Sequence, residues 1–200
     1  YAAVVVPADS DVSNMEDFLA VYDADPAGTP IGGGSVPGGM DHLVAAMVME
    51  ASGRDALGVN YIPYDAGGTA MAALLSGEIK ALSTGFSEAV DLANQGEVKI
   101  IGVTSDARVD AAPDAMTMME QGIDTTFVNW RGCFGAPGMS DEKLAQYQAA
   151  IAAMYDTDEW EAVRARNGWV NIHNPGNDFR TFLEEQETVI GDLMPKLGFL

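Results

Sequence analysis

Residues 29–52 read TPIGGGSVPGGMDHLVAAMVMEAS, and this stretch decides the fold. A short β-prone start at 29–31 leads into a glycine-rich turn at 32–39, and a helical pattern over 40–52 follows, with Leu43, Met47 and the alanines on one side. Gly53 is the expected end of this helix. A strand, a glycine-rich turn and a helix in this order are typical of an α/β fold.

The same order recurs along the chain to residue 104. Further strands are predicted at 4–6, 59–64, 79–83 and 98–104, and further helices at 69–75 and 87–94. Strands separated by single helices imply right-handed crossovers and a doubly wound, mainly parallel sheet.

The pattern changes after residue 122. Residues 125–134 read as one long strand, and three helical segments follow at 141–155, 158–167 and 177–194. Helices with a single strand to pack on form an incomplete layer, so we expect a further sheet to complete it.

Composition excludes several classes of function. The chain has 30 acidic and 10 basic residues and a net charge of −20, and this field repels nucleic acid and anionic membranes. No apolar run reaches the ~18 residues that span a bilayer. With one cysteine, Cys133, and two distant histidines, neither a disulfide nor a metal site is expected, and no cofactor is predicted. The dispersed acid suggests a saline habitat.

Three turns between strands and helices are the candidate binding site, and they lie at 32–39, 65–69 and 84–87. In a parallel sheet such turns gather at the carboxyl ends of the strands, where ligands bind. All three carry glycine and a hydroxyl residue and none carries Lys or Arg, so we expect an uncharged cradle of N–H and O–H donors for an anion. The alternative is a merely tight, glycine-dependent turn. The candidate residues are Gly34, Ser35, Gly38, Gly39, Asp41, His42, Gly67, Gly68, Thr69 and Ser87.

Some of these residues allow other interpretations. His42 lies in the first turn of a helix, whose dipole lowers its pKa, so it is either a neutral donor or a packed structural histidine. Ser87 in Gly85-Phe86-Ser87-Glu88-Ala89 resembles a degraded nucleophile elbow of a serine hydrolase. Its other interpretations are a helix N-cap and a ligand hydroxyl.

A phosphate or nucleotide binder using the same turns is a further alternative, although 32–39 does not match the Walker pattern. Trp130 and Arg131 could reach a ligand, or they could be a buried tryptophan and an arginine in a surface ion pair.

Taken together, these motifs resemble the solute-binding component of tripartite tricarboxylate transporters (TctC-like, within the broader Bug-type group). The resemblance covers essentially the whole chain in order. It rests on 33–43 (GGSVPGGMDHL), 60–64 (NYIPY) with Gly67 and Gly68, 74–77 (LLSG), 85–88 (GFSE), 101–108 (IGVTSDAR), 119–122 (MEQG), and 129–132 (NWRG) with Ala136 and Pro137.

The resemblance implies a periplasmic receptor, not an enzyme, with a type II periplasmic-binding-protein fold of two lobes that close over a tricarboxylate such as citrate or a dicarboxylate. It implies crossing segments at 1–7 and 123–129, one complete lobe at 8–122, and the returning helical part of the other lobe at 130–200. The family's N-terminal segment has no counterpart here. The implied partners are membrane permease subunits, and the full-length protein is expected to be a monomer.

Overall fold

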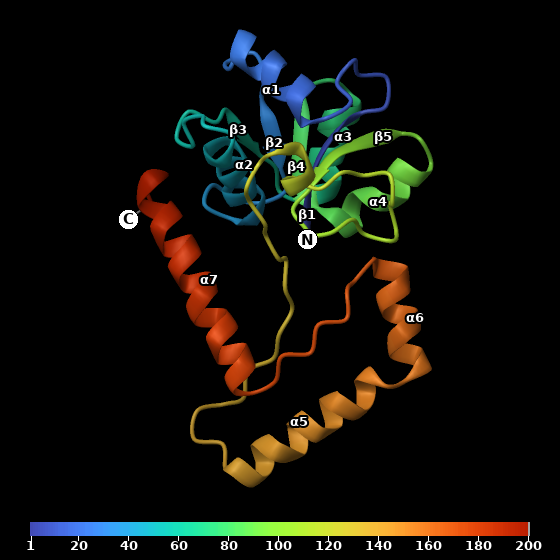
Figure 1. Cartoon of the computed structure of the whole chain (residues 1–200), viewed down its shortest axis with the longest axis vertical. Helices are drawn as coiled ribbons and strands as arrows, with labels where there is room; N and C mark the ends of the chain where they lie inside the picture. Colours follow the sequence, from blue (N-terminus) through green and yellow to red (C-terminus); the bar gives the residue numbers. More distant parts are fainter. Residues whose placement is uncertain (200) are drawn as a thin grey trace. The chain divides into compact units, whose positions relative to one another are not determined.

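A mixed sheet of five strands forms the centre of the computed structural model, which describes residues 1–199 (Figure 1). Its strands are β1 (Ala2–Pro7), β2 (Ile31–Gly33), β3 (Tyr61–Pro63), β4 (Ala81–Gly85) and β5 (Val98–Val103). They lie side by side in the order β3-β2-β4-β1-β5. β2 is parallel to β3 and β4, and β1 is antiparallel to β4 and β5. Four strands therefore run one way, as the predicted mainly parallel sheet requires, and only β1, next to the edge strand β5, is reversed.

Helices cover both faces of this sheet. They are α1 (Met15–Ala24), α2 (Met40–Ala51), α3 (Gly67–Leu75) and α4 (Phe86–Asn94), with a short 3-10 helix at Met119–Gln121. β1 shows how the faces divide: Ala2, Val4 and Val6 enter the core with α1 and α2, whereas Ala3 and Val5 enter the core with α3 and α4. The strict alternation of a β-strand thus places one apolar strand in two cores.

The order of the strands creates a switch point between β2 and β4. The chain leaves β2 for α2 on one face of the sheet, and it leaves β4 for α4 on the other face. In doubly wound sheets the crevice outside the carboxyl ends of the strands at such a point is where ligands bind. The turns 32–39 and 84–87 lie at this point.

A second unit comprises Trp130–Gly191, and the first comprises Tyr1–Asn129 with the end of the chain from Asp192. The second unit holds α5 (Asp141–Tyr155), α6 (Asp158–Asn167) and most of α7 (Asn177–Lys196) (Figure 1). The predicted strand at 125–134 is wrong, because the described residues there pair with no other strand. The crossing segments stay a prediction.

The second unit leaves apolar side chains uncovered within the described residues. Leu144, Tyr147 and Met154 recur on one side of α5 and all are exposed. Trp130 instead packs edge-on against Phe179 and Phe182 of α7. The expected incomplete layer is thus visible along α5.

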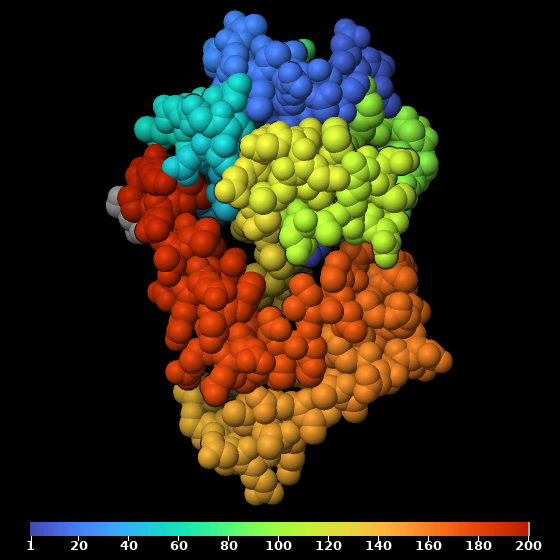
Figure 2. Space-filling view, viewed as in Figure 1, coloured from blue at the N-terminus to red at the C-terminus, as the bar shows by residue number. Residues whose placement is uncertain are grey.

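The last residues of the chain pack on the first unit. Leu193 and Leu197 are buried, and Lys196 forms an ion pair with Glu50 of α2. Figure 2 shows this red end of the chain against the blue-green segment that carries α2.

Candidate functional site

The three predicted turns meet at the carboxyl edge of the sheet. A side chain on Gly34 would overlap the backbone nitrogen of Gly67, so the turn 32–39 lies directly against the start of α3. A side chain on Gly67 would overlap the carboxylate of Glu88, which belongs to the first turn of α4. Glycine is required at both positions because a backbone or a carboxylate occupies the space that a Cβ would take.

The glycine-rich turn holds a carboxylate of the chain itself. Asp41, in the first turn of α2, is 5% exposed, and the hydroxyl of Ser35 donates to its Oδ2 at 2.9 Å. Burial raises the pKa of Asp41, and the Ser35 hydroxyl, together with the nearby backbone N–H groups of Gly34 and Ser35, partly offsets that effect by lowering it. An anion does lie in the turn, as its N–H groups suggest, but it is internal.

Two further glycines offer no free donors, contrary to the expectation for this turn. The N–H of Gly38 donates to Nδ1 of His42 at 3.0 Å, and the N–H of Gly39 donates to the carbonyl of Val36 at 2.8 Å. Both groups are therefore used inside the turn, and neither is left for an incoming ligand.

His42 is packed in the structure. Its ring stacks on Tyr61 with centroids 4.6 Å apart and meets the edge of Phe199 at 5.8 Å. Burial lowers its pKa. Burial therefore lowers the pKa of His42 in addition to any effect of the helix dipole. Nδ1 accepts a hydrogen bond only when the imidazole ring is neutral. Tyr61, which the sequence did not mark, also donates its hydroxyl to the carbonyl of Ser35 at 2.7 Å.

The start of α3 is the most open donor set of the three. The hydroxyl of Thr69 bonds back to the carbonyl and N–H of Ala66. Within residues 1–199 the N–H groups of Gly67 and Gly68 have no acceptor, and no atom lies within 4 Å of a Cβ built on Gly68. The first N–H groups of a helix have no partner inside it, so they point to an external acceptor.

Ser87 is not the N-cap of α4, because Gly85 takes that position and Ser87 is the second residue of the helix. Its hydroxyl has no hydrogen bond to any described residue. Nothing in residues 1–199 therefore orients a base on Ser87, as a nucleophile elbow would need. Its role as a ligand hydroxyl stays a prediction.

The expectation that the three turns form an uncharged cradle is wrong, because a carboxylate lies among them. Glu88 lies exposed beside Gly67, and its Oε2 accepts from the hydroxyl of Thr84 at 2.9 Å. Its charge also raises the pKa of Asp41. The four ion pairs of the described residues include neither carboxylate. A glutamate in the first turn of a helix is ordinary, so no signal in the sequence marked Glu88.

Three other residues complete the description. Asn129, which the sequence interpretation did not select, lies at the start of α4, with its Nδ2 3.4 Å from a Cβ built on Gly85. Trp130 and Arg131 belong to the second unit. The Arg131 guanidinium donates to the carbonyl of Trp130 at 3.2 Å. Their part in ligand binding stays a prediction.

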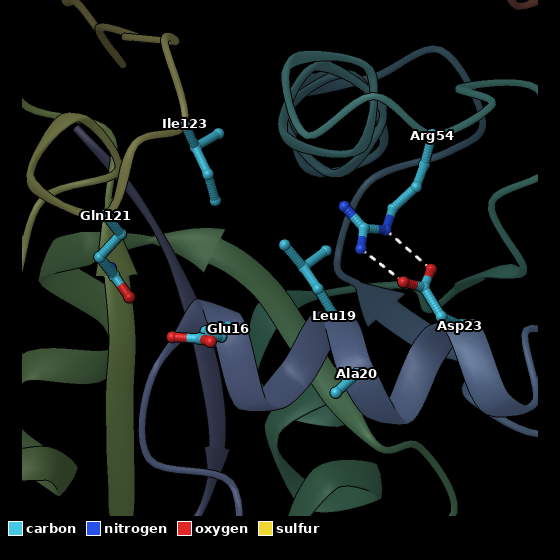
Figure 3. Close-up of a pocket in the computed structure, with 7 residues that line it drawn as sticks. All are labelled: Glu16, Leu19, Ala20, Asp23, Arg54, Gln121 and Ile123. Carbon is cyan, nitrogen blue, oxygen red and sulfur yellow. Dashed lines mark hydrogen bonds and ion pairs between the residues drawn. The ribbon is translucent and has the colours of Figure 1, made fainter.

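A hollow of about 360 Å³ lies elsewhere on the first unit (Figure 3). Its lining residues are Glu16, Leu19, Ala20, Asp23, Arg54, Gln121 and Ile123. Arg54 is the basic residue of this lining, and it is already bound by Asp23 through Nε and Nη2 at 2.8 and 2.5 Å and by the carbonyl of Ser52. With its cation neutralised, the hollow has no group that favours a carboxylate.

Comparison with known proteins gives the same assignment throughout. The family described as the tripartite tricarboxylate transporter family receptor (TctC) matches residues 1–199. UPF0065 proteins of Cupriavidus necator and Bordetella pertussis are 28% and 26% identical, over 72% and 71% of this chain. The chain covers 42% and 44% of their lengths, so it spans less than half of these curated relatives.

Solved structures agree on the fold. A TctC solute-binding protein from Polaromonas superposes with a TM-score of 0.81 at 26% identity, over 98% of this chain and 66% of that one. A malate-bound MatC from Rhodopseudomonas palustris has a TM-score of 0.80 at 17% identity, over 96% and 65%. A protein of R. palustris solved with adipate has a TM-score of 0.84 at 17% identity, over 98% and 65%.

The matched family is one of transporter receptors and the Polaromonas protein is a solute-binding protein, and proteins of this kind are not enzymes. The coverage of about 65% of their chains fits one lobe with part of the other, in the periplasmic-binding-protein fold. The match of the family over residues 1–199 establishes the assignment: the chain belongs to the tripartite tricarboxylate transporter receptor family.

Proposed function

We propose that this protein is an extracytoplasmic receptor that captures a small di- or tricarboxylate for a tripartite tricarboxylate transporter. The observation that carries the proposal is the pair of N–H groups of Gly67 and Gly68, without acceptors in residues 1–199, at the point where three turns meet. Backbone N–H groups and the positive end of a helix dipole bind carboxylates without a formal charge. Reversible capture suits a receptor that must release its ligand.

The neighbours solved with malate and adipate support a carboxylate ligand, and citrate belongs to the same chemical class. Thr69, Ser87, Trp130 and Arg131 remain candidate ligand residues in this proposal. Membership of the family supports a periplasmic location and membrane permease partners. Among residues 1–199, no helix has the length and apolar character needed to cross a bilayer.

The test uses the full-length gene product, because this chain covers about two thirds of the solved relatives. Thermal shift and calorimetry with succinate, malate, adipate, citrate and inorganic phosphate should show binding of at least one carboxylate. At a ligand concentration a hundredfold above Kd the expected stabilisation is about 2.7 kcal/mol. Binding of phosphate alone, or of nothing in this panel, would contradict the proposal.

Variants of Gly68 locate the site. Gly68→Pro removes one N–H donor in the first turn of α3, where proline is tolerated, and Gly68→Ala keeps that donor. A Cβ at position 68 meets no atom within 4 Å, so both variants have an open space for it. We expect Gly68→Pro to weaken carboxylate binding about tenfold, as the loss of a hydrogen bond to a charged group does, and Gly68→Ala to leave it unchanged. Equal affinities for the two variants would place the ligand elsewhere.

A further inference from the structure

The carboxylate of Glu88 lies where a bound acid would meet it. It touches Gly67 at the start of α3, and its Oε1 is 3.6 Å from a Cβ built on Gly85 at the start of α4. Oε2 accepts from Thr84, and no hydrogen bond to Oε1 is formed by any residue of 1–199. Oε2 is the oxygen nearest Gly67, and Oε1 lies 3.9 Å from a Cβ built on Gly67. A carboxylate accepts several hydrogen bonds, so the Glu88 carboxylate retains acceptor capacity beside the start of α3.

A second carboxylate makes this place strongly negative. Asp41 is near enough for the charge of Glu88 to raise the pKa of Asp41, and neither group forms an ion pair with a described residue. A ligand that carries only carboxylates meets N–H donors here, but it also meets like charges. A ligand that carries a donor beside its carboxylate meets a partner instead of repulsion.

An unsatisfied hydroxyl lies on the face of the sheet on which Asp41 packs. Ser83 is 0% exposed and its Oγ has no partner among the described residues. Gly32 of β2 pairs with Leu82 of β4, so Ser83 is level with Gly33, and it faces the same core as Ala81. Asp41 packs on Gly33 on that face. Buried hydroxyls are nearly always bonded, so a polar group is expected to enter beside Asp41.

We propose that Glu88 makes the receptor select carboxylates that carry a hydroxyl or an ammonium group on the carbon next to the carboxylate. The ligand carboxylate binds the N–H groups of Gly67 and Gly68, and the neighbouring donor of the ligand binds the carboxylate of Glu88. The two ligand groups are on adjacent carbons, which matches the direct contact between Glu88 and Gly67. This inference rests on the proposed function and names its ligand class.

The experiment measures Kd by calorimetry for succinate, malate and aspartate on the full-length gene product. All three acids have a four-carbon dicarboxylate skeleton. Succinate carries no donor next to its carboxylate, malate carries a hydroxyl, and aspartate carries an ammonium group. We expect malate or aspartate to bind at least about tenfold more tightly than succinate, the effect of one hydrogen bond to a charged group. The acid that binds more tightly, malate or aspartate, shows whether Glu88 prefers a hydroxyl or an ammonium donor.

Glu88→Gln removes the charge and keeps the size of the side chain. Asp91→Asn makes the same change of charge on the exposed surface of the same helix, and so serves as the control. We expect Glu88→Gln to reduce the preference over succinate to about threefold or less, and Asp91→Asn to preserve it. Unfolding midpoints confirm that both variants fold.

The outcomes separate the two proposals. Binding of succinate, malate and aspartate with equal affinity would overturn this inference and leave the proposed function intact. The same holds if Glu88→Gln keeps the full preference. If no acid of either panel binds, the proposed function fails and this inference fails with it.

Discussion

Replacing Gly34 by alanine tests whether the contact between the turn 32–39 and α3 builds the site. A Cβ on Gly34 would overlap the nitrogen of Gly67 and would lie 2.6 Å from the carbonyl carbon of Ala66. Ordinary contact begins at 3.4 Å, so the two segments must move apart by about 0.8 Å or more. Both are backbone, and neither can rotate away as a side chain does. Overpacking of this kind typically costs about 1–3 kcal/mol.

This cost should appear in both stability and binding. For a chain of this size, about 1–3 kcal/mol lowers Tm by roughly 2–12 °C. Displacement of α3 also moves the N–H groups of Gly67 and Gly68, so we expect the carboxylate Kd to rise about tenfold or more. Urea denaturation and differential scanning fluorimetry measure the first effect, and calorimetry the second.

The matched control is Gly68→Ala, since a Cβ there meets no atom within 4 Å and the backbone has no positive φ. Its Tm should be unchanged or slightly raised, because alanine favours a helix over glycine by up to about 1 kcal/mol. If Gly34→Ala matched this control in both Tm and affinity, the turn and α3 would not depend on their close contact, and the reasoning would be refuted.

Three further predictions concern pH, salt and a half-buried amide. Burial lowers the pKa of His42, so its contribution to stability is complete above the unfolded pKa of about 6.5 and is lost as the pH falls through the folded value. His42→Asn should therefore lose less stability than the wild type between pH 7.5 and 5 in urea titrations, and an equal loss would contradict the assignment. Raising KCl should raise the unfolding midpoint by screening the net charge of −20, whereas a flat or falling midpoint would argue against adaptation to salt. Gln121 accepts from the N–H of Met15 at 2.8 Å and donates to the carbonyls of Ile101 and Thr117. Gln121→Ala should lower the free energy of unfolding by about 1–3 kcal/mol, because it leaves these groups unpaired. Glu120→Ala is the control, because it removes a more exposed pairing with Arg108. The difference between the two losses is the part that is specific to the hydrogen bonds of Gln121.

Several parts of the fold could be predicted from local signals. Helices α5 and α6 have the predicted bounds because each begins at a capping hydroxyl, Ser140 and Thr157, and α6 ends at the left-handed Gly168. The reversal of β1 could not be predicted, since an apolar run of valines has the same pattern in either direction. The strand expected at 125–134 failed because β-prone residues form a strand only when another strand pairs with them.

The candidate site shows a similar division. That the three turns meet followed from parallel strands, whose carboxyl ends lie at one edge of the sheet. The sequence could not show which donors remain free, because spacing does not reveal that the hydroxyl of Ser35 donates to Asp41. Nor can it show that Nδ1 of His42 takes the N–H of Gly38. Such local pairings depend on side-chain rotation, and only the folded arrangement fixes them.

The packing of Leu193, Leu197 and Phe199 on the first unit has a consequence for synthesis. Because Phe199 follows His42 and Tyr61 by more than a hundred residues, the ribosome must synthesise nearly the whole intervening chain before this surface can be covered. A nascent chain that stops shortly before residue 192 therefore exposes apolar surface on α2 to chaperones and proteases.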